Sequence, residues 1–240
     1  MKRYIPYIQA VAIIALVIFL YGFSSKRNEA KKINKVQVIF VNGDNLFITY
    51  ETVNKLLIQN HGTLTSQPKE TIILSKLEGT LYANEMIEKA EVFLSVDGEL
   101  GVSITQKTPI ARIHQDGHAF YIDSNGKRMP MSSNYSARVP VVEGLTDGMK
   151  TEGIYQLAKF IFEDPLLQKQ VIGIVQHPGN TFSLKTRVGN QLIELGTLDG
   201  LTDKVNKLKA FYQKTMNDKT LYNYKSINLK YNNQVVCTKK

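Results

Sequence analysis

The stretch that decides the fold is residues 72–113, which read IILSKLEGTLYANEMIEKAEVFLSVDGELGVSITQKTPIARI. Three leucines recur at helical spacing in its first third, with lysine and glutamate off that face. Residues 92–104 then alternate apolar with other side chains, as half-buried strands do. Asp97-Gly98 interrupts this alternation and favours a hairpin, because glycine tolerates a positive φ. The stretch therefore predicts a helix followed by a β-hairpin.

The residues before this stretch predict a strand and another helix. Val36, Val38 and Phe40 alternate with other side chains, which is typical of a strand. Thr49 is the expected N-cap of the helix that follows, because its hydroxyl can accept a hydrogen bond from a free backbone N–H. Residues 33–107 thus have the order β-α-α-β-β, and the fold class is α+β.

Residues 108–238 predict several short strands and two helices. Asn125-Gly126 is a turn signal after a strand-like run. Apolar faces over residues 154–161 and 201–216 predict the helices, and Thr202 is the expected N-cap of the second. Further strand-like runs occupy residues 171–176, 181–186, 191–195, 226–229 and 234–237.

The N-terminal residues predict a transmembrane helix. Residues 5–23 carry no charge and are almost wholly apolar. As a helix of about 1.5 Å rise per residue, they would extend roughly 28 Å, enough to cross a bilayer core. The alternative is a cleaved signal peptide, with Gly22-Phe23-Ser24 as a weak cleavage site, but the apolar run is long for one.

Charge and cysteine content narrow the class of protein. The chain has 240 residues and a formal net charge of +9. Its densest basic run follows the apolar segment, which indicates a juxtamembrane collar. No nucleic-acid-binding motif is recognisable. Cys237 is the only cysteine, which excludes an internal disulfide, and it fits a small apolar strand residue.

The charges that flank the apolar segment bear on the orientation of the protein in the membrane. Lys2 and Arg3 precede the span, and a larger group of basic residues follows it. A literal positive-inside count would therefore place the large domain in the cytoplasm. The basic residues that follow the span are Lys26, Arg27, Lys31, Lys32 and Lys35.

Catalytic and metal-binding signatures are absent from the sequence. There is no phosphate-binding loop, serine-nucleophile elbow or zinc-protease motif. His114 and His118 are four residues apart, but they flank the turn-prone Asp116-Gly117 rather than lie on a helix. We therefore expect a non-enzyme with no cofactor, no metal and no small-molecule substrate.

Local motifs carry a resemblance to a known family. Residues 72–113 closely resemble the second half of a POTRA domain, a protein-docking module. The whole part beyond the apolar segment resembles the FtsQ/DivIB family of bacterial cell-division proteins. The matching segments are Lys76-Leu77-Glu78 with Leu81, Ile87-Glu88-Lys89-Ala90-Glu91-Val92, Gln106-Lys107-Thr108-Pro109-Ile110-Ala111, Tyr121-Ile122-Asp123-Ser124-Asn125-Gly126, Val139-Pro140-Val141-Val142-Glu143-Gly144 and Leu195-Gly196.

The resemblance implies a domain plan and a location. It implies a single-pass, type II protein of the cytoplasmic (inner) membrane, with the large domain on the periplasmic or extracytoplasmic side. The β domain would be mainly antiparallel with flanking helices. The expected parts are a cytoplasmic tail (1–4), a transmembrane helix (5–23), a basic juxtamembrane linker (24–32), a POTRA domain (33–107), a β domain (108–238) and a tail (239–240).

The resemblance also implies a function and a site. The protein would be a divisome scaffold that binds FtsB- and FtsL-like proteins by β-strand addition and helps to control septal peptidoglycan synthesis. By position, the edge would be residues 230–237, with Asn228-Leu229-Lys230 in place of an Asp-Leu-Arg-like strand and therefore without its ion pair. The partner-binding residues would be Lys230, Tyr231, Asn233, Val235 and Cys237.

Three other functions remain as alternatives. Another POTRA-containing envelope assembly or secretion factor shares the docking module, although the repeated amphipathic strands of an outer-membrane transporter are not evident. An anchored envelope hydrolase would need a convergent nucleophile, base or acid pair, which the sequence does not offer. A cytoplasm-facing nucleic-acid binder is favoured only by the flanking charge.

Overall fold

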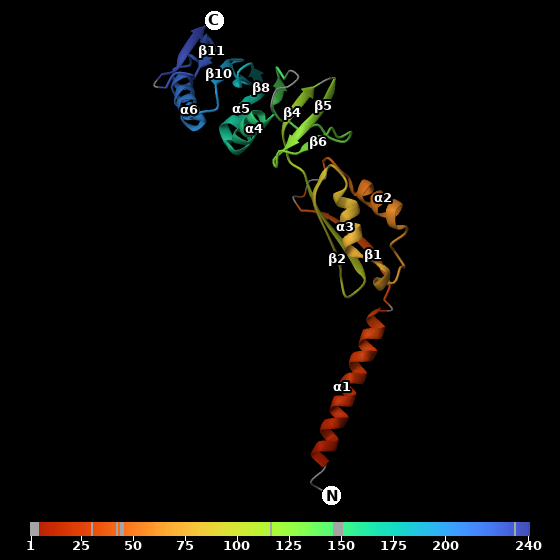
Figure 1. The fold of residues 1–240 in the computed structure, drawn as a ribbon. Helices are drawn as coiled ribbons and strands as arrows, with labels where there is room; N and C mark the ends of the chain where they lie inside the picture. Colours follow the sequence, from red (N-terminus) through yellow and green to blue (C-terminus); the bar gives the residue numbers. More distant parts are fainter. Residues whose placement is uncertain are drawn as a thin grey trace. The chain divides into compact units, whose positions relative to one another are not determined.

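The computed structural model describes residues 5–29, 31–41, 43, 46–115, 117–145, 151–232 and 234–240. Asp116, Asn233 and the tail 1–4 therefore lie outside the described residues. The chain divides into two compact units, Met1–Gln106 and Lys107–Lys240. Their helices and strands can be followed in Figure 1.

The first unit contains the predicted β-α-α-β-β order. An N-terminal helix, α1 (Ile5–Glu29), precedes it and continues past the apolar segment through Lys26 and Arg27. Among the described residues, no helix combines the length and the hydropathy needed to cross a membrane. The elements that follow are β1 (Lys35–Phe40), α2 (Tyr50–His61), a short 3-10 helix (Lys69–Thr71), α3 (Leu74–Tyr82), β2 (Ile87–Leu94) and β3 (Glu99–Gln106).

Local chemistry places these elements where the sequence predicts them. The Thr49 hydroxyl accepts a hydrogen bond from the Thr52 N–H at 3.2 Å and caps α2. Gly62, with a φ of +72°, ends that helix. Gly98, with a φ of +89°, lies in the tight turn between β2 and β3. The hairpin prediction is therefore confirmed.

The first unit is a three-stranded sheet with helices on one face. The strand order is β1-β3-β2, with β1 parallel and β2 antiparallel to β3. On the face away from the helices, the Phe93 ring lies over Gly101 and is 52% exposed. The buried core between the helices and the other face includes Phe40, Val53, Leu57, Leu77, Leu81, Val92, Leu100, Val102 and Ile104.

The second unit is one large sheet with helices. Its strand order is β12-β11-β10-β9-β8-β7-β4-β5-β6. Its elements are β4 (Pro109–Gln115), β5 (His118–Asp123), β6 (Arg128–Pro130), β7 (Val141–Glu143), α4 (Glu152–Glu163), α5 (Pro165–Gln170), β8 (Val171–His177), β9 (Thr181–Thr186), β10 (Leu192–Gly196), α6 (Leu201–Asn217), a 3-10 helix (Leu221–Asn223), β11 (Tyr224–Asn228) and β12 (Val236–Lys239).

The large sheet is mixed but mainly antiparallel, in line with the prediction. The pairs β4–β5, β5–β6, β8–β9, β9–β10 and β11–β12 are antiparallel. The pairs β4–β7, β7–β8 and β10–β11 are parallel. Helices α4 and α5 connect β7 to β8, and α6 connects β10 to β11, so each returning strand runs in the same direction as the one before it. These helices pack their apolar residues into one core with the sheet.

The start of α6 differs from the prediction. Gly200, with a φ of +61°, occupies the N-cap position, and no side chain caps the helix there. Helix α6 begins at Leu201, so Thr202 already lies in its first turn. The prediction of Thr202 as the N-cap was therefore wrong, because a glycine in the left-handed region turns the chain into the helix two residues earlier.

Candidate protein-docking edge

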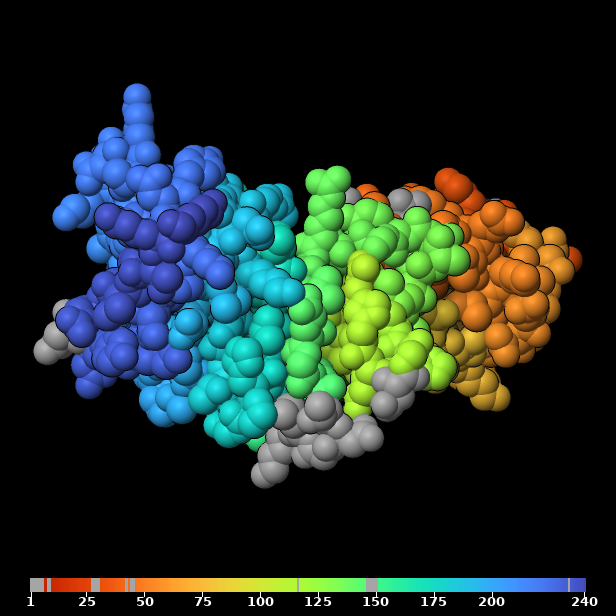
Figure 2. All heavy atoms as spheres, turned by 90° about the horizontal axis from the view of Figure 1, so that it is seen from above, coloured from red at the N-terminus to blue at the C-terminus, as the bar shows by residue number. Residues whose placement is uncertain are grey.

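The large sheet has two outer strands, and they differ in how open they are. Strand β6 has three residues and ends at Pro130, which has no N–H to donate to a further strand. Strand β12 is formed by Val236–Lys239 and pairs only with β11 among the described strands. Figure 2, which views the molecule from above relative to Figure 1, shows the C-terminal residues in dark blue on the surface. Strand β12 is therefore the candidate docking edge.

The outer side of β12 can be located from its pairing. Strand β12 runs antiparallel to β11, with Ile227 opposite Cys237 and Asn228 opposite Val236. The Lys240 N–H donates to the Asn223 carbonyl at 2.9 Å, on the inner side of the strand. Because backbone groups alternate in direction along a strand, those of Cys237 and Lys239 point away from β11. This row is available to another strand.

The two faces of β12 have different side chains. Val235 and Cys237 pack against the hydrophobic core of the second unit. Val236 is 42% exposed, and Thr238 is also exposed. Burial raises the pKa of the Cys237 thiol, which lowers its reactivity at neutral pH. A strand added here would therefore pair with the backbone groups of Cys237 and contact the exposed side chains of Val236 and Thr238.

The predicted site residues occupy different positions around this edge. Cys237 lies within β12, and Val235 directly precedes the first residue of that strand. Lys230 and Tyr231 lie in the connection between β11 and β12, so the edge strand is shorter and later than residues 230–237. Asn233 lies outside the described residues.

The connection that carries Tyr231 is held by helix α6. The Lys207 ammonium donates to the Tyr231 carbonyl at 2.6 Å and to the Asn232 carbonyl at 3.1 Å. The Lys230 N–H donates to the Asn228 side chain at 3.0 Å, which forms a local turn. The Tyr231 side chain itself is 50% exposed. Its backbone is therefore fixed while its ring faces solvent beside the edge.

An ion pair that the sequence did not predict lies next to the connection. The Lys230 ammonium is 2.7 Å from a Glu194 carboxylate oxygen, and the Asn228 amide donates to the same oxygen at 3.1 Å. Asn228 has no charge to pair with Lys230, so the ion pair within this strand is lost as expected. Lys230 pairs instead with an acid from β10, which lies beside β11 in the sheet. Since Lys230 is half exposed, this pair contributes about 0–1 kcal/mol.

A shallow groove of about 350 Å³ extends from this pair across the sheet. Glu194 and Lys230 form one end, and Leu192 contributes an apolar wall. His177 and Ser183 lie in the same groove, with 3.0 Å between the imidazole Nε2 and the hydroxyl oxygen. This surface was not predicted from the sequence, although residues of β8, β9 and β10 supply most of it.

The arrangement around β12 suits the binding of a further strand. Within the described ranges, no group of three His, Cys, Asp or Glu side chains could hold a metal ion. The polar side chains of the groove pair with each other across neighbouring strands. An open strand beside a mixed polar and apolar face is what strand addition requires.

Comparison with protein families agrees with the architecture of both units. Residues 32–105 match the POTRA-like domain, and residues 108–238 match the domain described as FtsQ/DivIB, C-terminal related. No curated protein matches the chain at a significant level. Both matched families are non-catalytic scaffolds, and the family domains suggest a role in cell division. Because the second match covers more than half of the residues, the chain belongs to the FtsQ/DivIB family.

Proposed function

We propose that this protein is a bitopic scaffold of the divisome that binds FtsB- and FtsL-like proteins through β12. A strand of the partner would pair with the outer side of β12 and extend the large sheet by one strand. Tyr231 would anchor the partner next to that strand, because exposed aromatic residues often dominate binding energy. Through these contacts the protein would help to control septal peptidoglycan synthesis.

The free edge of β12 is the observation that carries this proposal. Strand β2, at an edge of the small sheet, carries Lys89 and Glu91, whose side chains form an exposed ion pair at 2.5 Å. Charged residues of this kind discourage edge-to-edge pairing. Strand β12 has none before Lys239. Of these edges, it is the better suited to accept another strand.

Membrane attachment is the second part of the proposal. We infer that α1 attaches the protein to the cytoplasmic membrane, with the two units on the extracytoplasmic side. The support comes from the uncharged segment 5–23 and from the apolar side chains of residues 10–23, which are exposed. Ile14, Ile18 and Phe19 are each at least 60% exposed. Bare apolar surface of this extent on a helix needs an apolar environment.

A specific observation also favours the alternative of another POTRA-containing assembly or secretion factor. Strand β1 forms an edge of the small sheet. Ile39 on this strand is 44% exposed and Val41, which follows it, is 58% exposed. This edge could bind an extended client segment by the same backbone pairing.

A pull-down of the full chain from membranes tests the proposed partner site. Tyr231→Glu should abolish recovery of small single-span coiled-coil proteins, because the charge replaces the proposed aromatic anchor. Tyr222→Glu is the matched control, since Tyr222 is 63% exposed in the same unit but lies before β11. Lys239→Pro removes an outward N–H and should weaken recovery as well. Retention of these partners by Tyr231→Glu would remove Tyr231 from the site, and their absence with wild type would refute the proposed partners.

Cysteine labelling tests the topology separately. Replacement of Cys237 by serine leaves a chain without cysteine, and Tyr222→Cys then adds one exposed thiol. A membrane-impermeant thiol reagent should label this position in intact spheroplasts. Labelling only after lysis would place the large domain in the cytoplasm, and release by carbonate washing would argue against an anchor.

A further inference from the structure

We propose that three segments of the first unit form a lock, residues 31–34, 66–69 and 95–98, which fixes the chain directly after α1. Helix α1 ends at Glu29, two residues before the lock begins. A linker between a membrane anchor and a docking domain is usually flexible, to an extent set by its composition. Here the contacts indicate that the chain after α1 is part of the domain.

One side of the lock is a set of backbone hydrogen bonds. The Ile33 N–H donates to the Gln67 carbonyl at 2.9 Å, and the Ser66 N–H donates to the Ile33 carbonyl at 2.7 Å. The Lys69 N–H donates to the Lys31 carbonyl at 3.1 Å. Ile33 is 1% exposed and belongs to the core of this unit. The segment after α1 is therefore paired with residues 66–69, and Ile33 anchors it in the core.

The other side of the lock closes on the tip of the β2–β3 hairpin. The Asn34 N–H donates to the Gly98 carbonyl at 3.0 Å, and its side-chain amide donates to the Asp97 carbonyl at 3.0 Å. The Lys69 ammonium donates to the Ser95 and Val96 carbonyls, at 2.7 Å each. Charge-assisted bonds of this kind are stronger than neutral ones. They hold the tip against the segment after α1.

Gly98 is the residue on which closure depends. A Cβ atom at this position would lie 2.6 Å from the Lys32 carbonyl oxygen, which is backbone and cannot rotate away. Its φ of +89° also disfavours any other residue. A larger residue would therefore separate the hairpin tip from segment 31–34.

The lock shortens the free chain between α1 and the core of the first unit. Only Ala30 separates α1 from the locked segment in the sequence. Because Ile33 belongs to the core of the first unit, only a few residues of sequence lie between α1 and that core. Where α1 is a membrane anchor, which rests on the function proposed above, the lock would couple the docking domain to the membrane.

Hydrogen exchange on the full chain in detergent tests the lock. In Gly98→Ala, protection at the Ile33, Asn34 and Lys69 amides should fall by roughly tenfold or more, whereas the Ala83 amide, at the C-cap of α3, should change much less. Gly62→Ala is the matched control, because Gly62 has a φ of +72° and open space around its Cβ position. It should leave the lock amides within about threefold of wild type.

A second variant keeps the test decisive if Gly98→Ala does not fold. Lys69→Met removes the ammonium without straining the backbone and should lower protection at the same amides, whereas Lys76→Met on α3 should not. Trypsin cleavage after Lys31 or Lys32 should rise in parallel. Fast exchange of these amides in wild type, or equal effects of the two glycine variants, would overturn the lock. Neither result depends on partner binding or on membrane attachment, so failure of those proposals is separately visible.

Discussion

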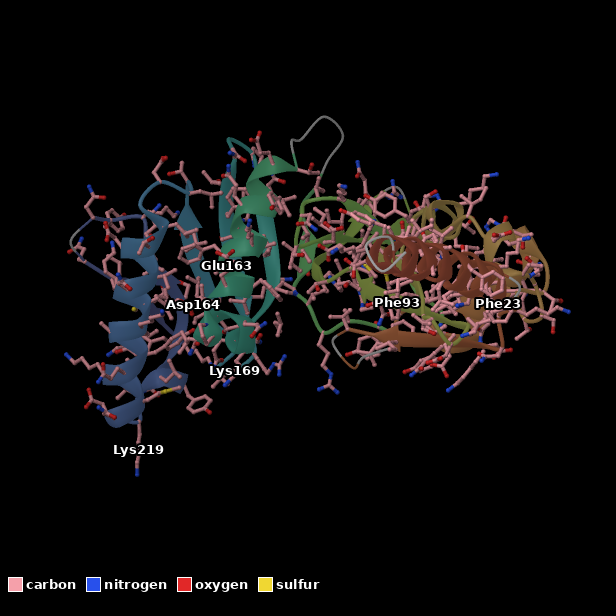
Figure 3. The ribbon with its side chains drawn as sticks, turned by 90° about the horizontal axis from the view of Figure 1, so that it is seen from below. Phe23, Phe93, Glu163, Asp164, Lys169 and Lys219 are labelled. Atoms are coloured by element: carbon pink, nitrogen blue, oxygen red, sulfur yellow. The ribbon has the colours of Figure 1, made fainter. Side chains whose placement is uncertain are left out.

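Replacement of Asp164 should distinguish a helix cap from an ion pair in the second unit. Asp164 lies between α4 and α5 (Figure 3), and one of its carboxylate oxygens accepts hydrogen bonds from the Leu166 and Leu167 N–H groups at 3.0 and 3.1 Å. The other oxygen is 2.5 Å from the Lys209 ammonium of α6. Pro165 occupies the first helical position of α5, where the lack of a backbone N–H costs no hydrogen bond within the helix. Asp164 therefore both starts α5 and ties it to α6.

The two roles differ in expected magnitude. Loss of an N-cap costs about 1 kcal/mol, with a range of roughly 0.5–2 kcal/mol. A partly exposed ion pair contributes about 0.5 kcal/mol. Asparagine keeps the cap but loses the charge, so Asp164→Asn should cost about 0.5 kcal/mol and Asp164→Ala about 1–2.5 kcal/mol. At roughly 4 °C per kcal/mol for a unit of this size, the melting temperature should fall by about 2 °C for Asp164→Asn and by about 4–10 °C for Asp164→Ala.

Differential scanning calorimetry of the full chain, with hydrogen exchange at α5 to assign the transition, measures both values. Lys209→Met should match Asp164→Asn, and the double variant should be no worse than either, because both remove the same pair. Equal losses for Asp164→Asn and Asp164→Ala would refute the cap as the main contribution. A strictly additive double variant would refute the pair.

The same residue predicts a dependence on pH. Desolvation raises the pKa of Asp164, but the hydrogen bonds from Lys209, Leu167 and Leu166 outweigh it, so that the pKa lies below its usual value. A carboxyl group with a lowered pKa in the folded state stabilises the protein above its unfolded-state pKa. That contribution is lost as the pH falls through the folded-state pKa. The difference between wild type and Asp164→Asn should therefore shrink in acid.

Three further predictions concern other parts of the molecule. Lys230→Glu should place two carboxylates together and lower stability by about 1 kcal/mol or less, and the charge-swapped pair with Glu194→Lys should recover it in urea unfolding. Gly101→Ala places a Cβ 2.2 Å from the Phe93 ring, so it should displace the ring and show a coupling of about 0.5–1 kcal/mol with Phe93→Ala in a double-mutant cycle. Burial raises the pKa of Tyr212 to about 12. The wild type should therefore lose stability as the pH rises from about 10, the unfolded-state pKa of tyrosine, through about 12. Tyr212→Phe should remove this loss, as measured by circular dichroism during alkaline unfolding.

Local patterns predicted most of the first unit because its decisive signals lie close together in sequence. The Asp97-Gly98 turn, the Thr49 cap and the leucine spacing of α3 each need only neighbouring residues. The sequence also indicated the helical faces that became α4 and α6. The lock was not predictable in this way, since Lys31 and Asn34 contact residues more than sixty positions away. From the sequence, these residues read only as part of a basic run.

The candidate edge was predicted only in outline for a related reason. Apolar alternation indicated strand material near the C-terminus, but it could not say where pairing begins. Lys207 of α6 holds the chain at Tyr231 and Asn232, which delays the strand to Val236. The acid that pairs with Lys230 comes from β10, because parallel pairing of β10 with β11 places Glu194 beside Asn228. Both contacts depend on sheet order, which local patterns do not contain.

The position of β12 explains why a partner strand would have a large effect there. The strand is four residues long, and its register with β11 shifts between Tyr224 and Ser226. Its inward side chain Cys237, like Val235 directly before the strand, is only partly buried. A strand this short contributes little burial of its own, so it should open more readily than the central strands. A partner that pairs with its outer side would bind only the closed form, and the binding energy would therefore also stabilise β12 in place.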